Sequence, residues 1–403
     1  MKAWYAACLT HGEMMRFPTA VVLLCGCAAQ PSDLTAPPEP EGALAQAATV
    51  TCPAPTVVST AGANEVGVVG DPGAPAGIFD ASTVYPAGAP GGALAYSAVL
   101  SQHDIRTRIA LSSTGGALWS YVAEVNHPEL AFIASPDPAE CPGGLCGGWL
   151  ISEVSSLIYD PTDPNPGARW KLYAHRYLAE ATDRLHYALG AITVQVAPAP
   201  QGPWTAPRKL FGWPNPSGYS LAGAQVDVSK LAGLADCVAL TEPGALWLPD
   251  RIDVALGCVY LAAGAPRIRV VQLRSTDHGA SWASAGRLLD VGDADCLPGA
   301  APGASVNAAN LFVGPDGAEY LAATASDGNG YHGCAIYRVD DPWTGHVERT
   351  PTGAPRVLRA IVADVGGFSG ACAHSAGTGY TLAAAALGQA RPFRLYRAGR
   401  VAP

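Results

Sequence analysis

The feature that most limits the fold of this chain is the shortness of its apolar runs. After residue 50 these runs are rich in Val, Ile, Leu and Tyr, and they end at Gly, Pro, Asp or Asn. None shows the 3.6-residue period of an amphipathic helix. Short β-prone runs between turn residues, repeated along a chain, indicate an all-β sandwich, barrel or propeller.

The runs group loosely into five units of four strands. This repeat predicts an all-β, five-bladed β-propeller of four-stranded antiparallel blades, with a six-bladed, sialidase-like propeller as the alternative. The fifth unit is one strand short, and we expect residues 56–60 (TVVST) to close the ring. The first strand of each unit should be the innermost one, which gives 77–86, 149–160, 237–248, 308–317 and 369–377.

Composition excludes one class of partner. Only 14% of the 403 residues are charged, the formal net charge is −9, and no run of Lys or Arg occurs. A nucleic-acid-binding protein needs a basic face, so we expect no nucleic-acid partner.

The N-terminal segment has the features of an export signal. Arg16 precedes the apolar run 17–25, which is shorter than the about 20 residues that span a bilayer. The run ends in Leu24-Cys25-Gly26-Cys27, which resembles the bacterial lipobox. The resemblance implies that Cys27 is lipidated and becomes the mature N-terminus. A plain signal peptide with a chance cysteine is the alternative reading.

These features predict three parts: a lipoprotein signal peptide over 1–27, a disordered proline-rich tether over 28–48, and a β-propeller domain over 49–403. The true start could instead be Met14 or Met15, because either would place Arg16 in a conventional signal peptide. We expect an exported, probable monomer that is held to the outer membrane or cell surface by its lipid anchor only.

The cysteines fit an oxidising compartment. Three of the 11 cysteines lie in the leader, and the remaining eight form an even set that indicates disulfides. Cys141 and Cys146 should pair, because the Pro-Gly-Gly turn in CPGGLC brings them together. The other pairings stay open. Zinc is the rival interpretation, but no CxxC spacing occurs.

Two turn motifs agree with the propeller. Residues 275–282 (STDHGASW) match S-x-D-x-G-x-x-W, the Asp-box, and residues 112–119 (SSTGGALW) are a degenerate copy. The motif is similar to that of sialidases and related propellers, where it joins the third and fourth strands of a blade. The phrases GPWTAP (202–207) and DDPWTG (340–345) resemble turns of five-bladed glycoside hydrolases of the arabinanase, xylosidase and invertase-like group.

The expected inner strands carry three carboxylates, Asp80, Glu153 and Glu242. Unpaired buried charges are costly, so their presence in apolar strands needs a reason. Glycoside hydrolysis uses one protonated carboxylic acid and one carboxylate, and crowding supplies the raised pKa of the acid. Resemblance to the hydrolase group implies that Asp80 is the base or nucleophile and Glu242 the acid, with Glu153 adjusting the pKa values. Ala81 stands where that group normally has proline.

Further residues are candidates for substrate binding near the channel. They come from inner strands, a second strand and the loop DGNGYHG, and they are His175, Arg176, Asn307, Tyr331, His332 and His374. We expect no cofactor and no catalytic metal; a structural cation on the propeller axis is left open.

Three functions remain open at this point. The first is a glycoside hydrolase-like propeller that acts on, or binds, extracellular glycans through its channel of carboxylates. The second is a non-catalytic propeller lipoprotein that binds a glycan or a protein. The third is a sialidase-like hydrolase, although the F/Y-R-I-P phrase of sialidases is missing from the sequence.

Overall fold

The computed structural model describes residues 54–59, 64–182, 184–296, 300, 303–326, 331–362, 368–377, 380–386 and 393–400. The predicted signal peptide, with Cys27, and the predicted tether lie outside these residues. Strands dominate, and the only helical pieces within the described ranges are three 3₁₀ turns, Pro166–Ala168, Val228–Lys230 and Asp293–Cys296. In this part of the chain no helix has the length and apolar character needed to cross a membrane.

The first sheet corresponds to the first predicted unit. It runs from the inner strand β4 outward in antiparallel order, and the short β3 adds in parallel to its outer edge. Its strands are β4 (Gly77–Val84), β5 (Gly92–Ser101), β6 (Asp104–Ser112), β7 (Trp119–Asn126) and β3 (Val68–Val69).

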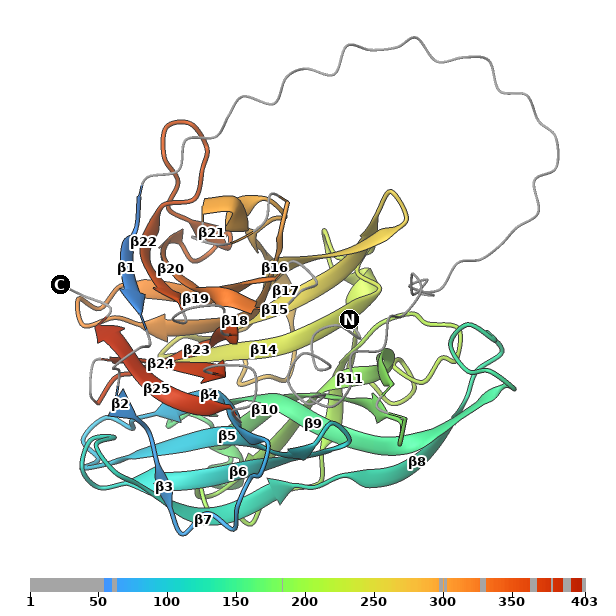
Figure 1. Ribbon diagram of the computed structural model, residues 1–403, viewed down its shortest axis with the longest axis horizontal. Coiled ribbons are helices and arrows are strands. Elements are labelled where there is room, and N and C mark those ends of the chain that lie inside the picture. Colours follow the sequence, from blue (N-terminus) through green and yellow to red (C-terminus); the bar gives the residue numbers. More distant parts are fainter. Residues whose placement is uncertain are drawn as a thin grey trace, which may run out of the picture.

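The second sheet contains the predicted unit and two strands that the sequence pattern did not reveal, β8 and the short β13. The inner strand β9 starts well before the predicted residue 149 and forms a long hairpin with β8, which projects from the body of the molecule in Figure 1. Its strands are β8 (Glu129–Ala134), β9 (Leu145–Tyr159), β10 (Trp170–Ala179), β11 (Leu185–Ala197), β12 (Arg208–Gly212) and β13 (Val226–Asp227).

The third sheet is a four-stranded antiparallel blade in simple sequence order. Its strands are β14 (Ala239–Leu248), β15 (Arg251–Ala262), β16 (Ala265–Ser275) and β17 (Ala283–Leu289).

The fourth sheet holds ten strands and contains both remaining units. Two antiparallel groups are joined by a single parallel pairing, His332 with Ser369. The first group is β18 (Ser305–Val313), β19 (Glu319–Ser326), β20 (Tyr331–Asp341), β21 (His346–Val347) and β22 (Val357–Val362). The second is β23 (Phe368–Ser375), β24 (Tyr380–Ala386) and β25 (Arg394–Arg400).

The chain is thus an all-β propeller, but its hydrogen-bonded sheets number four among the described residues, not five or six. The expected closure is also different. Residues 56–60 were expected to complete the fifth predicted unit. Instead β1 (Thr56–Ser59) pairs in parallel with β22, which belongs to the fourth predicted unit. The missing strand is instead β2 (Asn64–Glu65), which pairs antiparallel with β25.

The inner strands share one irregularity. Each of the five carries a register shift against its neighbour, and each shift contains a non-glycine residue with positive φ. These residues are Asp80 (51°), Val154 (49°), Glu242 (51°), Ala308 (45°) and Ala371 (49°). We call these positions the inner bulges. A bulge bends its strand and redirects side chains. Here every inner strand has one such bulge.

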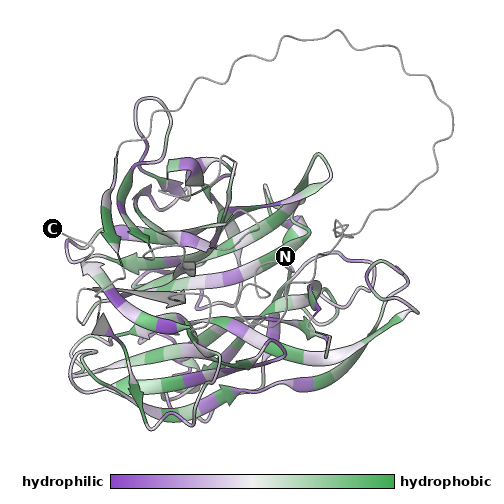
Figure 2. Ribbon diagram, viewed as in Figure 1, coloured by the Kyte–Doolittle hydropathy of each residue, from purple (hydrophilic) through white to green (hydrophobic). Residues whose placement is uncertain are grey.

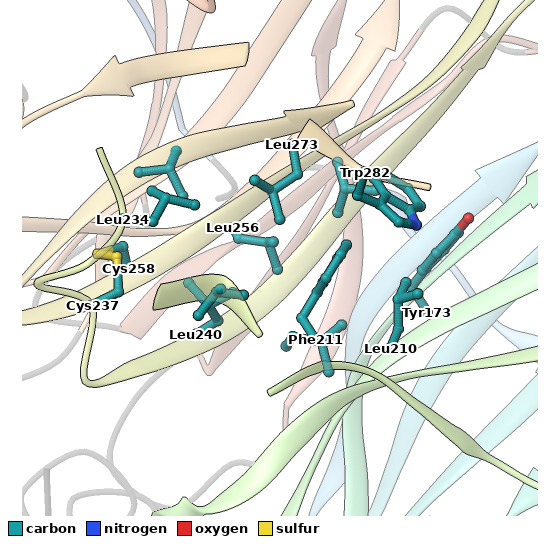
Figure 3. Close-up of a cluster of buried hydrophobic side chains, with 14 of the residues drawn as sticks. Tyr173, Leu210, Phe211, Leu234, Cys237, Leu240, Leu256, Cys258, Leu273 and Trp282 are labelled. Atoms are coloured by element: carbon teal, nitrogen blue, oxygen red, sulfur yellow. A yellow bond between two sulfur atoms is a disulfide. The ribbon is translucent and has the colours of Figure 1, made fainter. Parts of the chain in front are cut away.

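Apolar side chains fill the spaces between neighbouring sheets. The strands carry them as short green stretches between purple ones in Figure 2. Figure 3 shows the cluster between the second and third sheets, in which Phe211, Leu240, Leu256 and Leu273 are fully buried. Trp282 closes this cluster, with its ring edge-on to Phe211 at 5.1 Å and to Tyr173 at 6.3 Å.

Disulfides reinforce the sheets. The predicted pair Cys141–Cys146 is bonded and closes the β8–β9 hairpin. Cys237–Cys258 lies within the third sheet, and Cys334–Cys372 joins the two groups of the fourth. Since these cysteines are bonded to each other, they are not zinc ligands.

The turn at 275–282 has the hydrogen bonds expected for its sequence. It connects β16 to β17, the third and fourth strands of the sheet. Asp277 accepts the backbone N–H of Ser281 at 2.8 Å, Ser275 accepts that of Gly279, and Gly279 has φ 93°. In the copy at 112–119, Thr114 replaces the carboxylate and accepts the N–H of Leu118 at 2.9 Å.

The two Pro-Trp-Thr turns also occupy equivalent places, each between the third and fourth strands of its unit. Trp343 lies over the guanidinium groups of Arg251 and Arg274 in the third sheet, at 4.9 and 4.4 Å. Trp204 packs in the cluster between the first and second sheets. Both turns therefore fasten a sheet to the one before it.

Candidate functional site

The first carboxylate of the candidate site is Asp80, at the inner bulge of β4. It is 4% exposed. Its Oδ2 accepts the hydroxyl of Ser97 at 3.1 Å and the backbone N–H of Val154 at 3.2 Å. Its Oδ1 has no hydrogen-bond partner within the described ranges. Burial, and then the charges of Glu153 and Glu242, raise the pKa of Asp80 well above its usual value.

The second carboxylate is Glu242, at the equivalent bulge of β14. Its Oε1 accepts the hydroxyl of Tyr331 at 2.6 Å, whereas Oε2 is buried and finds no partner in the described chain. Burial is the main cause that raises the pKa of Glu242 to about 8, and Glu153 adds to it. Hydrogen bonds from Tyr331 and from the backbone of Ala308 act in the opposite direction.

The third carboxylate, Glu153, comes one residue before the bulge of β9. It is 3% exposed and stands opposite His175 of β10 in the strand register. His175 is fully buried, neither of its ring nitrogens has a hydrogen-bond partner among described residues, and burial lowers its pKa to about 3. The imidazole is therefore neutral at pH 7.

The three carboxyl groups influence one another electrostatically. The charge of Glu153 raises the pKa of both Asp80 and Glu242, the charge of Glu242 raises that of Asp80, and the main electrostatic influences on Asp80 and Glu242 include no arginine. Three such groups in a buried space do not all ionise at neutral pH. Since the pKa of Glu242 is about 8, Glu242 holds a proton at pH 7, and this removes one repulsion that acts on Asp80.

Beside the carboxylates lies a cavity of about 20 Å³. All five inner bulges contribute to its wall, including Asp80, Val154, Pro243, Ala308 and Ala371. Such a volume holds about one water molecule. A sugar ring needs a far larger space than this cavity offers.

An apolar strip leads outward from Glu153 along β9. Side chains on one face of a strand recur every second residue, which places Trp149, Gly147 and Leu145 on the same face as Glu153. On β8, Phe132 pairs with Gly147 and Leu130 with Trp149. Phe132 and Leu130 are each 66% exposed, and Leu145 is 54% exposed. A Cβ at Gly147 would lie 2.9 Å from the Phe132 ring, so glycine lets this ring lie flat across the strand.

Aromatic rings continue the strip at its inner end. Trp149 stacks on His103 from the first sheet, with centroids 4.9 Å apart. Tyr187 lies 5.6 Å from His175 and 4.6 Å from Tyr177, and it is partly exposed. Burial is the main cause that raises the pKa of Tyr187, and the charges of Glu153 and Glu242 raise it further. Tyr187 is therefore a partly exposed ring within reach of the charges of Glu153 and Glu242.

The structure brings together some predicted site residues and separates others. Asp80, Glu153, Glu242, His175 and Tyr331 lie in one cluster, as their contacts show. Asn307 is close by, where its Oδ1 accepts the hydroxyl of Thr241 at 3.0 Å.

Three predicted residues have other neighbours. Arg176 alternates to the opposite face from His175 and pairs with Glu129 at 2.6 Å. His374 is buried against Phe312 at 4.7 Å. His332 contributes the backbone pairing that joins the two groups of the fourth sheet.

Sequence reasoning missed Tyr187 and the β8–β9 strip. No motif marks Tyr187, which approaches the site only because the β10–β11 register shifts after Tyr177. The alternation of Leu130 and Phe132 was a visible strand signal, but the loop proline residues around it obscured it.

Metal ligands are scarce within the described residues. Three clusters of suitable groups occur there, and two of them use cysteines that are bonded in disulfides. The third combines Asp160, Asp163 and His278, but the ammonium group of Lys171 already binds Asp163, and His278 Nδ1 already lies 2.8 Å from Asp160. None of the three adjoins Asp80, Glu153 or Glu242.

Fold and site together define the protein as an all-β propeller with a buried cluster of carboxylates at its inner strands. No protein-family model matches the chain, and no curated protein matches it. Solved structures do match. A thermostable family-43 glycoside hydrolase is 10% identical, with a TM-score of 0.49 over 80% of this chain and 89% of that one.

Two other matches have similar values. The alpha-L-arabinofuranosidase PaAbf62A from Podospora anserina is 12% identical, with a TM-score of 0.44 over 85% of this chain and 96% of that one. An endo-1,4-beta-xylanase from Bacteroides thetaiotaomicron is 12% identical, with a TM-score of 0.43 over 79% of this chain and 88% of that one. At such low identity the likeness concerns the fold alone, and the function has to be argued from the side chains.

Proposed function

We propose that the protein is a glycoside hydrolase that acts on extracellular glycans. The observation that carries this proposal is the convergence of Asp80, Glu153 and Glu242 from three different strands into one buried cluster, in which the pKa values of Asp80 and Glu242 are raised. Such a cluster destabilises the fold, and perturbed carboxyl groups of this kind concentrate at functional sites. Glycoside hydrolysis needs a pair in opposite protonation states.

The roles follow from the environments of the groups. Glu242, protonated at neutral pH, would donate a proton to the oxygen of the leaving group. Asp80, held by Ser97 and Val154, would act as the base or nucleophile. Glu153 would keep the pKa of Glu242 high by its negative charge. His175, which faces Glu153 in the strand register, stays neutral at pH 7.

The proposed substrate is a chain rather than a small glycoside. The strip from Trp149 to Phe132 and Leu130 is apolar and partly aromatic. It lies on the same face of β9 as Glu153, from which the buried Ile151 separates it. Sugar rings present apolar C–H faces that pack on such surfaces, so several residues of a glycan could be held while one is cleaved. The disulfide Cys141–Cys146 keeps the hairpin rigid for this purpose.

The proposal extends to architecture and location. The ten-stranded sheet would function as two blades, since its two groups each carry an inner bulge and meet at one backbone pairing. Five blades would then surround the axis. Export and a lipid anchor at Cys27 would place the domain outside the cell; replacement of Cys27 by serine should release it from the membrane fraction.

The test is a turnover screen on chromogenic arabinosides, xylosides and galactosides and on arabinan, xylan and fructan. The wild type should cleave at least one substrate, and Asp80→Asn and Glu242→Gln should each lower kcat by at least a hundredfold. A matched control is Asp277→Asn, which lies in a turn away from the cluster. Activity that persists in Asp80→Asn would refute the assignment.

One observation favours a second candidate, a non-catalytic propeller that binds glycans. The three carboxylates are only 3–8% exposed, and the adjoining cavity has room for about one water molecule. This candidate predicts glycan binding without turnover, with affinity unchanged in Asp80→Asn and Glu242→Gln. The sialidase-like alternative has less support, because it would require arginines among the main influences on the cluster.

A further inference from the structure

Tyr331 makes the closest polar contact to the candidate acid. It is the first residue of β20, it comes from the fourth sheet, and its hydroxyl donates to Oε1 of Glu242 at 2.6 Å. Tyr331 and Glu242 are 5% and 8% exposed, so solvent does not compete for this hydrogen bond. The sequence had suggested Tyr331 as a platform for sugar, but its hydroxyl is directed at the carboxyl group.

We propose that Tyr331 is a positioning residue that confines the acidic proton of Glu242 to Oε2. The proposal rests on the function proposed above and adds to it the atom from which the proton would be delivered. It stands on the hydrogen bond, on the burial of both partners and on the unpartnered state of Oε2 in the described chain.

The chemical reason is the limited number of protons. A phenol hydroxyl has one hydrogen, and here that hydrogen points at Oε1. If the acidic proton also sat on Oε1, two hydrogens would face each other. The proton of neutral Glu242 therefore resides on Oε2, which is buried without a partner and is free to donate to a leaving oxygen.

Packing fixes the Tyr331 ring in this position. The ring stacks on Phe79 at 6.3 Å, with planes 22° apart. Behind it lies Gly370 of β23, where a Cβ would come within 2.5 Å of Tyr331 Cδ2. Glycine at 370 is thus required for the ring to sit where its hydroxyl reaches Glu242. Substitution of Gly370 by alanine would move the ring while keeping the hydroxyl.

The direction of the effect on Glu242 follows from its surroundings. The ionisable groups around it are Asp80 on β4, Glu153 on β9, Tyr187 on β11 and Tyr331 on β20. Among these, Tyr331 alone donates a hydrogen bond to Glu242, and this favours the ionised form. Removal of the donor should therefore raise the pKa of Glu242 further.

The test compares Tyr331→Phe with Tyr337→Phe. Tyr337 is a matched control because it lies on the same strand, is fully buried, and has a hydroxyl without a partner in the described residues. Infrared titration of the full chain, with the Glu242→Gln spectrum subtracted, reports the protonation of Glu242. Tyr331→Phe should raise the pKa of Glu242 by about one unit, and Tyr337→Phe should not change it.

With a cleavable glycan, Tyr331→Phe should also lower kcat about 10- to 100-fold, leave KM within about threefold, and shift the alkaline limb of the pH profile upward. Gly370→Ala should reproduce the shift if Tyr331→Phe does not fold. An unchanged titration of Glu242 in both variants would overturn the proposal. If no glycan is cleaved, the proposed hydrolase fails, but the infrared titration still decides the role of Tyr331.

Discussion

Val154 donates its backbone N–H to Oδ2 of Asp80 at 3.2 Å, and both residues occupy the positive-φ position of their own inner bulge. The backbone of Ala308 contacts Glu242 in the same way, from the bulge of the next inner strand. The bulges thus aim carboxylates inward and supply the donors that hold them. Backbone strain of this kind collects at functional sites.

The strain should be measurable at bulges without a carboxylate. Ala308 and Ala371 have φ near 45–49°, where a Cβ is unfavourable and glycine is not. Ala308→Gly and Ala371→Gly should each raise the free energy of unfolding by about 0.5–1 kcal/mol in urea denaturation. Ala323→Gly, in the regular interior of β19, should lower it by a similar amount. Destabilisation by the two bulge variants would show that the strain is absent.

The raised pKa of Glu242 predicts a pH-dependent stability. The pKa of about 8 in the folded protein exceeds the usual glutamate pKa of 4.5, so folding favours the protonated acid. The stability that this proton contributes is fully present below pH 4.5 and is lost as the pH rises to about 8. Glu242→Gln should remove this loss, which is on the order of a few kcal/mol.

Urea denaturation at pH 4.5, 6 and 8 checks this prediction. The free energy of unfolding of Glu242→Gln should rise relative to that of the wild type at each step upward in pH. A difference between the two proteins that stays constant across this range would contradict the shifted pKa.

A buried ion network should hold the third and fourth sheets together. Asp253 is fully buried and accepts Arg251 Nε at 2.8 Å and Arg274 Nε at 2.7 Å, while Arg251 also pairs with Glu319 of β19. Asp253→Asn would take from the buried Arg274 its carboxylate partner and leave Arg251 with Glu319 and Asp250 alone, and we expect a loss of about 3–5 kcal/mol in unfolding free energy. Asp290→Asn, which breaks a half-exposed pair with Arg287, should cost less than about 1 kcal/mol.

The turn around Asp277 should be structural only. Its carboxylate accepts the N–H and the hydroxyl of Ser281, and these hydrogen bonds lower its pKa to about 2. Asp277→Ala should therefore lower the melting temperature by a few degrees, for about 1 kcal/mol. Glycan turnover per folded molecule should be unchanged, and a large fall in kcat would assign this turn to the active site.

The exposed strip makes a prediction about chain length. Phe132→Ala removes an exposed ring, which should weaken binding of a polysaccharide about 2- to 10-fold in calorimetry. Turnover of a small chromogenic glycoside should not change, because that substrate does not reach the hairpin. Leu261→Ala is the matched control, since Leu261 is 53% exposed on the β15–β16 hairpin. Equal losses for both variants, or a change of oligomeric state in Phe132→Ala, would argue against a glycan on this strip.

Much of the local structure could be predicted from the sequence alone. Strand positions follow from short apolar runs and from Gly and Pro turns, and the Cys141–Cys146 bridge follows from the tight Pro-Gly-Gly turn between the two cysteines. The three carboxylates could be placed on inner strands by their position within each unit. These features depend on interactions between residues that are close in the sequence, so they can be predicted without knowledge of the tertiary structure.

Only the tertiary structure decided how the strands meet. The segments 56–60 and 64–65 are both short, so neither has a sequence pattern that identifies its partner strand. Asn64–Glu65 pairs with β25 because the folded chain places this segment beside the free edge of that strand. The hydrogen bond between Glu242 and Tyr331 joins residues 89 positions apart on different sheets. The merging of two groups into one sheet rests on one backbone pairing. Such contacts arise from the packing of the whole ring, because no local pattern specifies which distant edge or side chain will face a given residue.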